Sequence, residues 1–85
     1  MTADLYRGSH CVCRGVRVKD LKYAEASAVT GAIEWGAETI EPGGYRLHLY
    51  DGTVLDIRLH EVMSQGKPQL AASAAFTGEI VHAGT

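Results

Sequence analysis

The sequence lacks a long apolar run, and none of its hydrophobic stretches approaches the ~20 residues that a transmembrane helix needs. Its first residues, Met1–Tyr6, also lack the basic-then-apolar pattern of a secretory signal peptide. Basic residues are few, since eight Lys and Arg against ten Asp and Glu give a formal net charge of −2. This balance argues against a general nucleic-acid binder. We therefore expect a cytosolic protein that contacts neither a membrane nor nucleic acid directly.

Cysteine is scarce as well, with only Cys11 and Cys13 present. Their spacing on an expected strand places both thiols on one face, where a disulfide lies near the outer limit of bridging distance. A zinc site needs two further ligands, and no histidine stands at a characteristic spacing. We interpret the pair as small buried hydrophobic residues and expect no metal or cofactor. The alternative is a small metal- or redox-responsive module that uses both thiols.

Catalytic signatures are missing too. No serine lies in a Gly-x-Ser-x-Gly motif, the glycines form no phosphate-binding loop, and the four histidines are scattered. Glu34 and Glu38 are four residues apart, but a catalytic carboxylate pair needs an enclosed cleft, which a helix exterior rarely offers. We therefore do not expect an enzyme.

What the chain does contain is a stretch with helical spacing. Its 85 residues suffice for a single domain, 1–85, in which every element shares one core. Within Tyr23–Gly36, small or apolar residues recur at the spacings of one helix face: Ala28, Val29, Ala32, Ile33 and Gly36. This pattern predicts a helix that ends at Gly36, where a left-handed residue costs least.

Alternating residues before this stretch predict a hairpin. Tyr6–Cys13 and Val16–Leu21 are expected as strands, joined by a two-residue turn at Arg14–Gly15. That register pairs Cys13 with Val16 and leaves one face consistently apolar. Glycine at the second turn position suits a type I′ turn.

A second hairpin is expected after the Pro-Gly-Gly turn at residues 42–44. Tyr45–Tyr50 and Thr53–Val62 form its strands, and the alternation favours a three-residue loop over residues 50–52 with Gly52 left-handed. A two-residue loop would mix the two faces. The preferred register makes three cross-strand pairs: Tyr45 with Ile57, Arg46 with Asp56, and Leu47 with Leu55.

The C-terminal part of the sequence is compatible with two structures. Gln69–Phe76 has helical composition after Pro68, which predicts a short helix, although the stretch could instead pair as a strand with Glu79–His82. The expected fold class is therefore α+β. Its elements follow the order β-β-α-β-β in an antiparallel sheet with one helix packed on one face, and a possible short C-terminal helix.

Acidic residues gather in the middle of the chain. Between residues 23 and 45 there are four acids and no base: Glu25, Glu34, Glu38 and Glu41. This is either an ordinary solvated surface or a docking face for a basic partner. Trp35 is either a residue at the edge of the core or an interface anchor, and Tyr50 at the tip of the second hairpin is another exposed aromatic residue that could anchor binding.

The string Ala32-Ile33-Glu34-Trp35-Gly36 resembles a helix end in a phage-encoded type I-C anti-CRISPR protein. The likeness spans about Cys11–Leu59 and extends to small type I anti-CRISPR proteins, several of which combine a sheet with one helix. It implies a stoichiometric inhibitor that binds a type I Cascade complex and blocks target-DNA binding or nuclease recruitment. It also implies the contacts: Glu34, Glu38 and Glu41 against a basic surface, with Trp35 as anchor. A structural or dimerisation module that pairs through a sheet edge is the other alternative, and the oligomeric state is left open.

Overall fold

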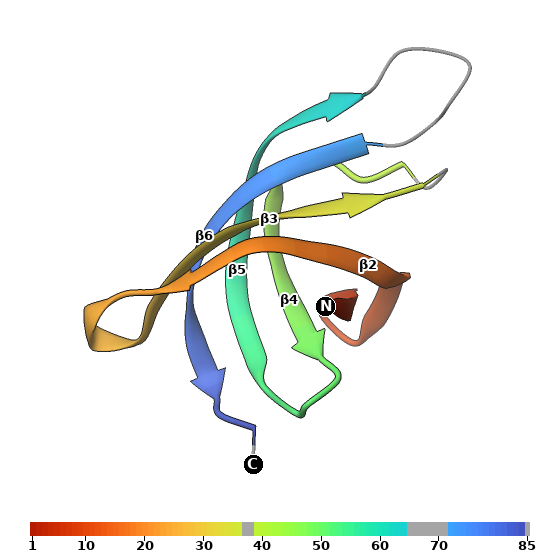
Figure 1. The fold of residues 1–85 in the computed structure, drawn as a ribbon. Helices are drawn as coiled ribbons and strands as arrows, with labels where there is room; N and C mark the ends of the chain where they lie inside the picture. Colours follow the sequence, from red (N-terminus) through yellow and green to blue (C-terminus); the bar gives the residue numbers. More distant parts are fainter. Residues whose placement is uncertain (37–38, 65–71, 85) are drawn as a thin grey trace.

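The computed structural model describes residues 1–36, 39–64 and 72–84, apart from the side chains of residues 63 and 64. In these residues the chain forms six strands and one 3-10 turn: β1 (Thr2–Arg7), β2 (His10–Tyr23), η1 (Glu25–Ser27), β3 (Ala28–Trp35), β4 (Gly43–Leu49), β5 (Val54–Ser64) and β6 (Ala72–His82). The strands close into one antiparallel barrel in the order β1-β2-β3-β6-β5-β4 (Figure 1). The predicted α+β fold with a helix packed on a sheet is therefore wrong.

The predicted helix over residues 23–36 is instead the end of β2, the η1 turn and β3. Val29, Ile33 and Trp35 of β3 are buried and Thr30 is exposed, which is the two-residue period of a strand. The spacing between Val29 and Ile33 misled the prediction, because residues four apart share a face in a helix and in a strand alike. Ile33 and Trp35, two residues apart, share a face only in a strand.

The β2–β3 hairpin extends beyond the barrel and ends in η1 (Figure 1). Ala26 and Ser27 at its tip have φ values of 59° and 67°, and Asp20 at a register shift in β2 has a φ of 56°. The Ala28 N–H donates to the Glu25 carbonyl and closes the turn. Every non-glycine residue with positive φ in the described ranges lies in this hairpin. Its backbone is thus the most strained part of the described fold.

The first hairpin turns earlier than predicted. Its loop is Gly8 and Ser9, between β1 and β2, and the predicted turn at residues 14–15 is wrong. Gly15 has a φ of 70° inside β2, where the register shifts, and its N–H donates to the Asp4 Oδ1 at 3.0 Å. A left-handed glycine suits a bulge as well as a type I′ turn, so the residue alone does not distinguish them. Cys13 consequently pairs with β1 rather than with Val16.

The β4–β5 hairpin has the predicted register and loop. Gly52 has a φ of 96°, its N–H donates to the Leu49 carbonyl at 3.0 Å, and Leu49 N–H donates to the Thr53 carbonyl at 2.9 Å. The cross-strand pairs are confirmed: Tyr45 with Ile57, Arg46 with Asp56, and Leu47 with Leu55. In this hairpin the alternation of buried and exposed side chains and the glycine in the loop predict the same register, and that register is the one observed.

The predicted C-terminal helix over residues 69–76 is also wrong. Residues 69–71 lie outside the described ranges, and the remainder belongs to β6, which pairs with β3 on one side and β5 on the other. Ala74 and Phe76 are buried while Ala75 and Thr77 are exposed, which is again a period of two. The alternative pairing with residues 79–82 is wrong as well, because those residues continue the same strand.

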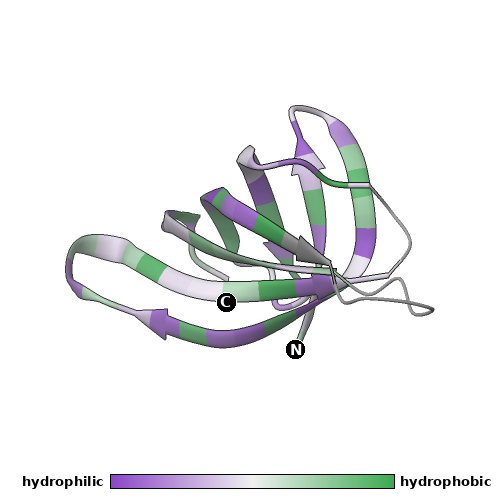
Figure 2. Cartoon of the chain, turned by 90° about the horizontal axis from the view of Figure 1, so that it is seen from above, coloured by the Kyte–Doolittle hydropathy of each residue, from purple (hydrophilic) through white to green (hydrophobic). Residues whose placement is uncertain are grey.

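The core is the interior of the barrel, filled by the inward-facing side chains of all six strands. Figure 2 shows hydrophobic and hydrophilic residues alternating along the strands, as expected when one face of each strand is buried. The buried hydrophobic residues are Ala3, Leu5, Val16, Val18, Val29, Ile33, Trp35, Ile40, Tyr45, Leu47, Leu49, Leu55, Ile57, Leu59, Ala72, Ala74 and Phe76. Outward-facing side chains of the same strands form the wall on which ligands or partners can bind.

Candidate binding surfaces

The predicted acidic contacts are placed on strand and loop, not on a helix. The Glu34 carboxylate on β3 lies 2.9 Å from the Lys19 Nζ on β2, so this acid is paired within its own chain. Glu41 is exposed before β4, and its carbonyl accepts a hydrogen bond from the Tyr45 hydroxyl at 2.7 Å. Glu38 lies outside the described residues. The acidic helix face expected for a basic partner is therefore not present.

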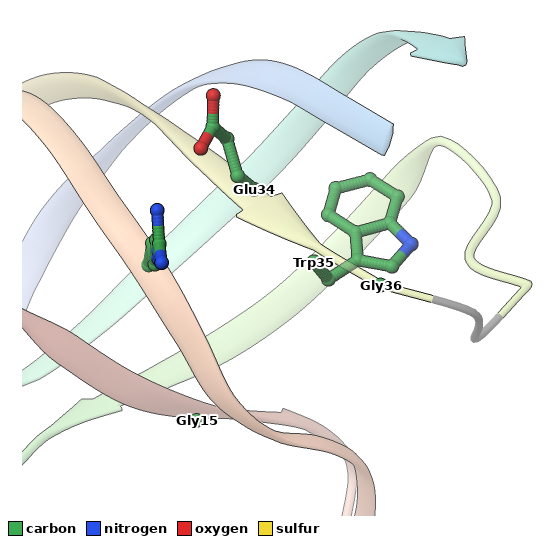
Figure 3. A pocket seen from close by; sticks show the side chains of 5 residues that line it. Gly15, Glu34, Trp35 and Gly36 are labelled. Carbon is green, nitrogen blue, oxygen red and sulfur yellow. The ribbon is translucent and has the colours of Figure 1, made fainter. Parts of the chain in front are cut away.

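Trp35 is buried, with 6% of its surface exposed. It borders an open hollow of about 330 Å³ whose other lining residues are Gly15, Arg17, Glu34 and Gly36. Figure 3 shows the Glu34 and Trp35 side chains leaving β3 in different directions. Most of the indole belongs to the core, so little of it is open to a partner in this conformation.

The predicted contact residues lie at opposite ends of the barrel. Since neighbouring strands are antiparallel, β1, β3 and β5 all end where β2, β4 and β6 begin. We call that end the tryptophan end, because it holds Trp35; Glu41, between β3 and β4, also lies there. Tyr50 lies in the β4–β5 loop at the other end, which we call the tyrosine end. One partner surface cannot be built from all of the predicted residues.

The tyrosine end carries the exposed apolar side chains. In the described residues, the large hydrophobic side chains that are exposed are Met1 (67%), Tyr23 (56%), Tyr50 (67%) and Val81 (43%). Each stands where β1, β3 or β5 begins or where β2, β4 or β6 ends. Tyr23 was missed from the sequence, because the turn that follows it contains neither Gly nor Pro, the usual markers of a hairpin.

The same end is acidic. Its exposed charged residues on β2, η1, the β4–β5 loop and β6 are Asp20, Lys22, Glu25, Asp51 and Glu79, four carboxylates and one ammonium. The Thr53 backbone N–H donates to the Asp51 Oδ1 at 2.9 Å. This hydrogen bond, with a contribution from the Thr53 side chain, holds the pKa of Asp51 below its ordinary value. The tyrosine end therefore combines apolar anchors with negative charge.

The two cysteines lie half-buried on β2, and no disulfide joins them. The Cys13 Sγ lies 3.8 Å from the Arg14 carbonyl oxygen. Within residues 1–36, 39–64 and 72–84, no group of three or more His, Cys, Asp or Glu side chains converges as a metal site requires. The described residues thus give the metal-responsive alternative no ligand set.

Comparisons of the chain with protein families, with characterised proteins and with solved structures found no match. In the described part of the chain, no helix has the length and apolar character needed to cross a lipid bilayer.

Proposed function

We propose that this protein is a stoichiometric, non-catalytic binding protein that contacts a protein partner through its tyrosine end. The observation that carries this proposal is the placement of Met1, Tyr23, Tyr50 and Val81, the exposed large hydrophobic residues of the described chain, at one end of the barrel. Exposed apolar side chains rimmed by polar ones mark interaction surfaces more often than ordinary surface. These four residues belong to different strands and loops of that end, so they do not form one continuous patch. We assign them as separate contact points within one interface.

Tyr23 is the strongest of these anchors. It stands near the tip of a projecting hairpin, where a side chain can enter a partner's pocket (Figure 1). Tyrosine offers a large amphipathic contact area at a low cost in conformational entropy, and it is enriched among residues that dominate binding energy. The strained backbone at Ala26 and Ser27 is a further sign, because such strain concentrates at functional sites.

The acidic rim indicates the chemistry of the partner. Asp20, Glu25, Asp51 and Glu79 outnumber Lys22, so a surface lined by Lys and Arg would be complementary. A complex that binds DNA presents such residues to phosphate groups. The type I Cascade complex implied by the sequence resemblance is a partner of this kind, and its inhibition in the cytosol of a host bacterium stays a prediction. The contact is now assigned to the tyrosine end.

The experiment is gel filtration and calorimetric titration of the purified chain against type I Cascade complexes. Tyr23→Ala and Tyr50→Ala should each weaken a detected complex, with a loss of about 2 kcal/mol or more if the tyrosine is a hot spot. Glu34→Gln and Glu41→Gln, at the tryptophan end, are the matched controls and should leave affinity unchanged.

Two results would contradict the proposal in different ways. Loss of binding in the Glu34 and Glu41 variants, with none in the tyrosine variants, would move the interface to the other end of the barrel. If no Cascade complex comigrates, the Cascade prediction fails. A photo-crosslinking amino acid placed at position 23 in the host cytosol then tests the broader claim. The absence of any adduct beyond that of a crosslinker at position 58, on the outer wall of β5, would overturn it.

A further inference from the structure

A second surface lies on the barrel wall, away from the tyrosine end. An open hollow of about 510 Å³ is lined by Tyr6 on β1, Gly8 and Ser9 in the β1–β2 loop, and Arg46 and His48 on β4. Tyr6 lies opposite Arg46 in the β1–β4 register, and its neighbours Leu5 and Leu47 are buried. Because side chains alternate along a strand, Tyr6, Arg46 and His48 all face outward.

The aromatic groups of this hollow form a platform. The rings of Tyr6 and His48 lie with their centroids 4.4 Å apart and their planes tilted by 43°. Both side chains are half-exposed, so each ring keeps surface that a ligand can cover. Aromatic side chains in such positions on strands stack planar bases, and this stacking is tolerant of base identity.

Arg46 supplies the positive charge. Its side chain is exposed, and in the described residues it has no ion-pair partner, although Asp56 lies opposite it on β5. The other nearby acid is Asp4, whose Oδ1 accepts hydrogen bonds from the Gly15 N–H at 3.0 Å and the Tyr50 hydroxyl at 3.4 Å. The guanidinium is therefore available to an anion, and a phosphate is one of the anions that it can hold in two-point contact.

The surroundings of the hollow favour an anion with a planar ring attached. Arg7, the residue after Tyr6 on β1, lies with its guanidinium carbon 5.5 Å from the ring centroid of the buried Tyr45, so this second cation belongs to the other face of the wall and does not line the hollow. The Ser9 hydroxyl lies in the exposed loop beside the hollow and can donate to a phosphate oxygen. A ring platform, a cation and a hydroxyl donor match the parts of a nucleotide.

We propose that the hollow lined by Tyr6, Arg46 and His48 binds a nucleotide unit, with the base stacked on the rings and the phosphate held by Arg46. The shared chemistry is a base carrying a phosphate, supplied by a single-stranded nucleic acid or by a free nucleotide. The formal net charge of −2 still excludes a general duplex binder. This site does not depend on the tyrosine end, so either proposal can fail alone.

The first test is fluorescence anisotropy of the full chain with labelled oligo(dT) and oligo(U), each about twelve nucleotides long. The second is a ¹⁵N NMR titration of the chain with AMP and, separately, with inorganic phosphate. Tyr6→Leu and Arg46→Gln should each weaken binding by about tenfold, the scale expected for loss of one stacked base or one phosphate contact. Amide shifts should centre on Gly8, Ser9 and His48. Retained thermal stability of Arg46→Gln separates lost binding from lost folding, because that side chain is exposed.

The matched controls are Tyr23→Leu, an exposed tyrosine at the tyrosine end, and Arg58→Gln, an outward arginine on β5 that does not line the hollow. Binding to the oligonucleotides alone would assign a single strand as the ligand, and AMP binding of equal strength would assign a free nucleotide. Equal losses in the Arg46 and Arg58 variants would reduce the effect to general charge attraction and overturn the proposal. The proposal would also be overturned if no binding were detected, or if inorganic phosphate alone reproduced the amide shifts caused by AMP.

Discussion

Gly31 on β3 lies directly opposite Phe76 on β6, and the phenylalanine ring occupies the space that a side chain at position 31 would need. A Cβ at position 31 would lie 2.8 Å from the Phe76 Cζ and 3.2 Å from the Lys19 carbonyl oxygen. Phe76 is 1% exposed, so the ring has little room to retreat. This pair joins two strands that are far apart in the sequence and closes the barrel wall between them.

Gly31→Ala should therefore destabilise the fold by about 1–3 kcal/mol, the usual cost of overpacking a filled core. Urea denaturation measures the change. Gly44→Ala is the matched control, because a Cβ there meets no atom within 4 Å, and its effect should stay within about 0.5 kcal/mol. Phe76→Leu in the Gly31→Ala background should recover part of the loss, and strictly additive effects would show that the two residues are not coupled.

The η1 turn offers a stabilising change. Ala26 and Ser27 both have positive φ, a conformation that hairpin turns normally give to Asn and Gly. The double substitution Ala26→Asn, Ser27→Gly should raise the free energy of unfolding by about 2 kcal/mol, because it relieves left-handed strain of about 1 kcal/mol at each of the two positions. Thermal unfolding provides the measurement. A decrease in stability would contradict the assigned turn.

Asp51 predicts a specific acid sensitivity. Its pKa is lowered in the folded state by the Thr53 backbone N–H and side chain. A carboxyl with a lowered folded pKa contributes stability above its unfolded pKa, and that contribution is lost as the pH falls through the folded value. A ¹³C NMR titration should place the midpoint of the Asp51 carboxyl below that of an unstructured aspartate. Thr53→Ala should raise this midpoint only in part, because the backbone N–H remains.

Asp51→Asn is the complementary change. It removes the titration, so the difference in stability between this variant and the parent should shrink as the solution is acidified. A constant difference across the acid range would contradict the assigned linkage.

The Lys19–Glu34 ion pair should contribute little. Both side chains are partly exposed, at 54% and 34%, so solvent screens their attraction. A double-mutant cycle with Lys19→Gln and Glu34→Gln should give a coupling of about 0.2–1 kcal/mol. The coupling should fall further in 1 M salt, where the Debye length is about 3 Å. A coupling that persists in high salt would indicate a packing role instead.

The sequence was sufficient where two signals were local and agreed. In the β4–β5 hairpin, alternation set the faces and Gly52 marked the turn, so the pairing of Leu47 with Leu55 was predicted correctly. In β2 one signal was ambiguous. Gly15 indicates a residue with a left-handed backbone conformation. Whether it lies in a turn or in a bulge depends on how β2 pairs with β1.

The binding surfaces were less accessible to sequence reasoning than the hairpin. Glu34 and Trp35 were correctly recognised as neighbours, but their use as one contact assumed a helix face, and on β3 they point in different directions (Figure 3). Tyr6 and His48 are far apart in the chain and meet because β1 pairs with β4. No spacing rule within one element could have joined them.

By itself the sequence determined the alternation of β4 and β5, the position of their loop and the absence of a long apolar span, because these depend on neighbours along the chain. Only the tertiary structure decided that residues 28–35 form a strand. Their small side chains and four-residue spacing suit a helix equally well, and the choice is made by β2 and β6, which supply hydrogen bonds on both edges. Closure of the barrel pairs residues distant in sequence, and this pairing sets both the tyrosine end and the hollow beside Arg46.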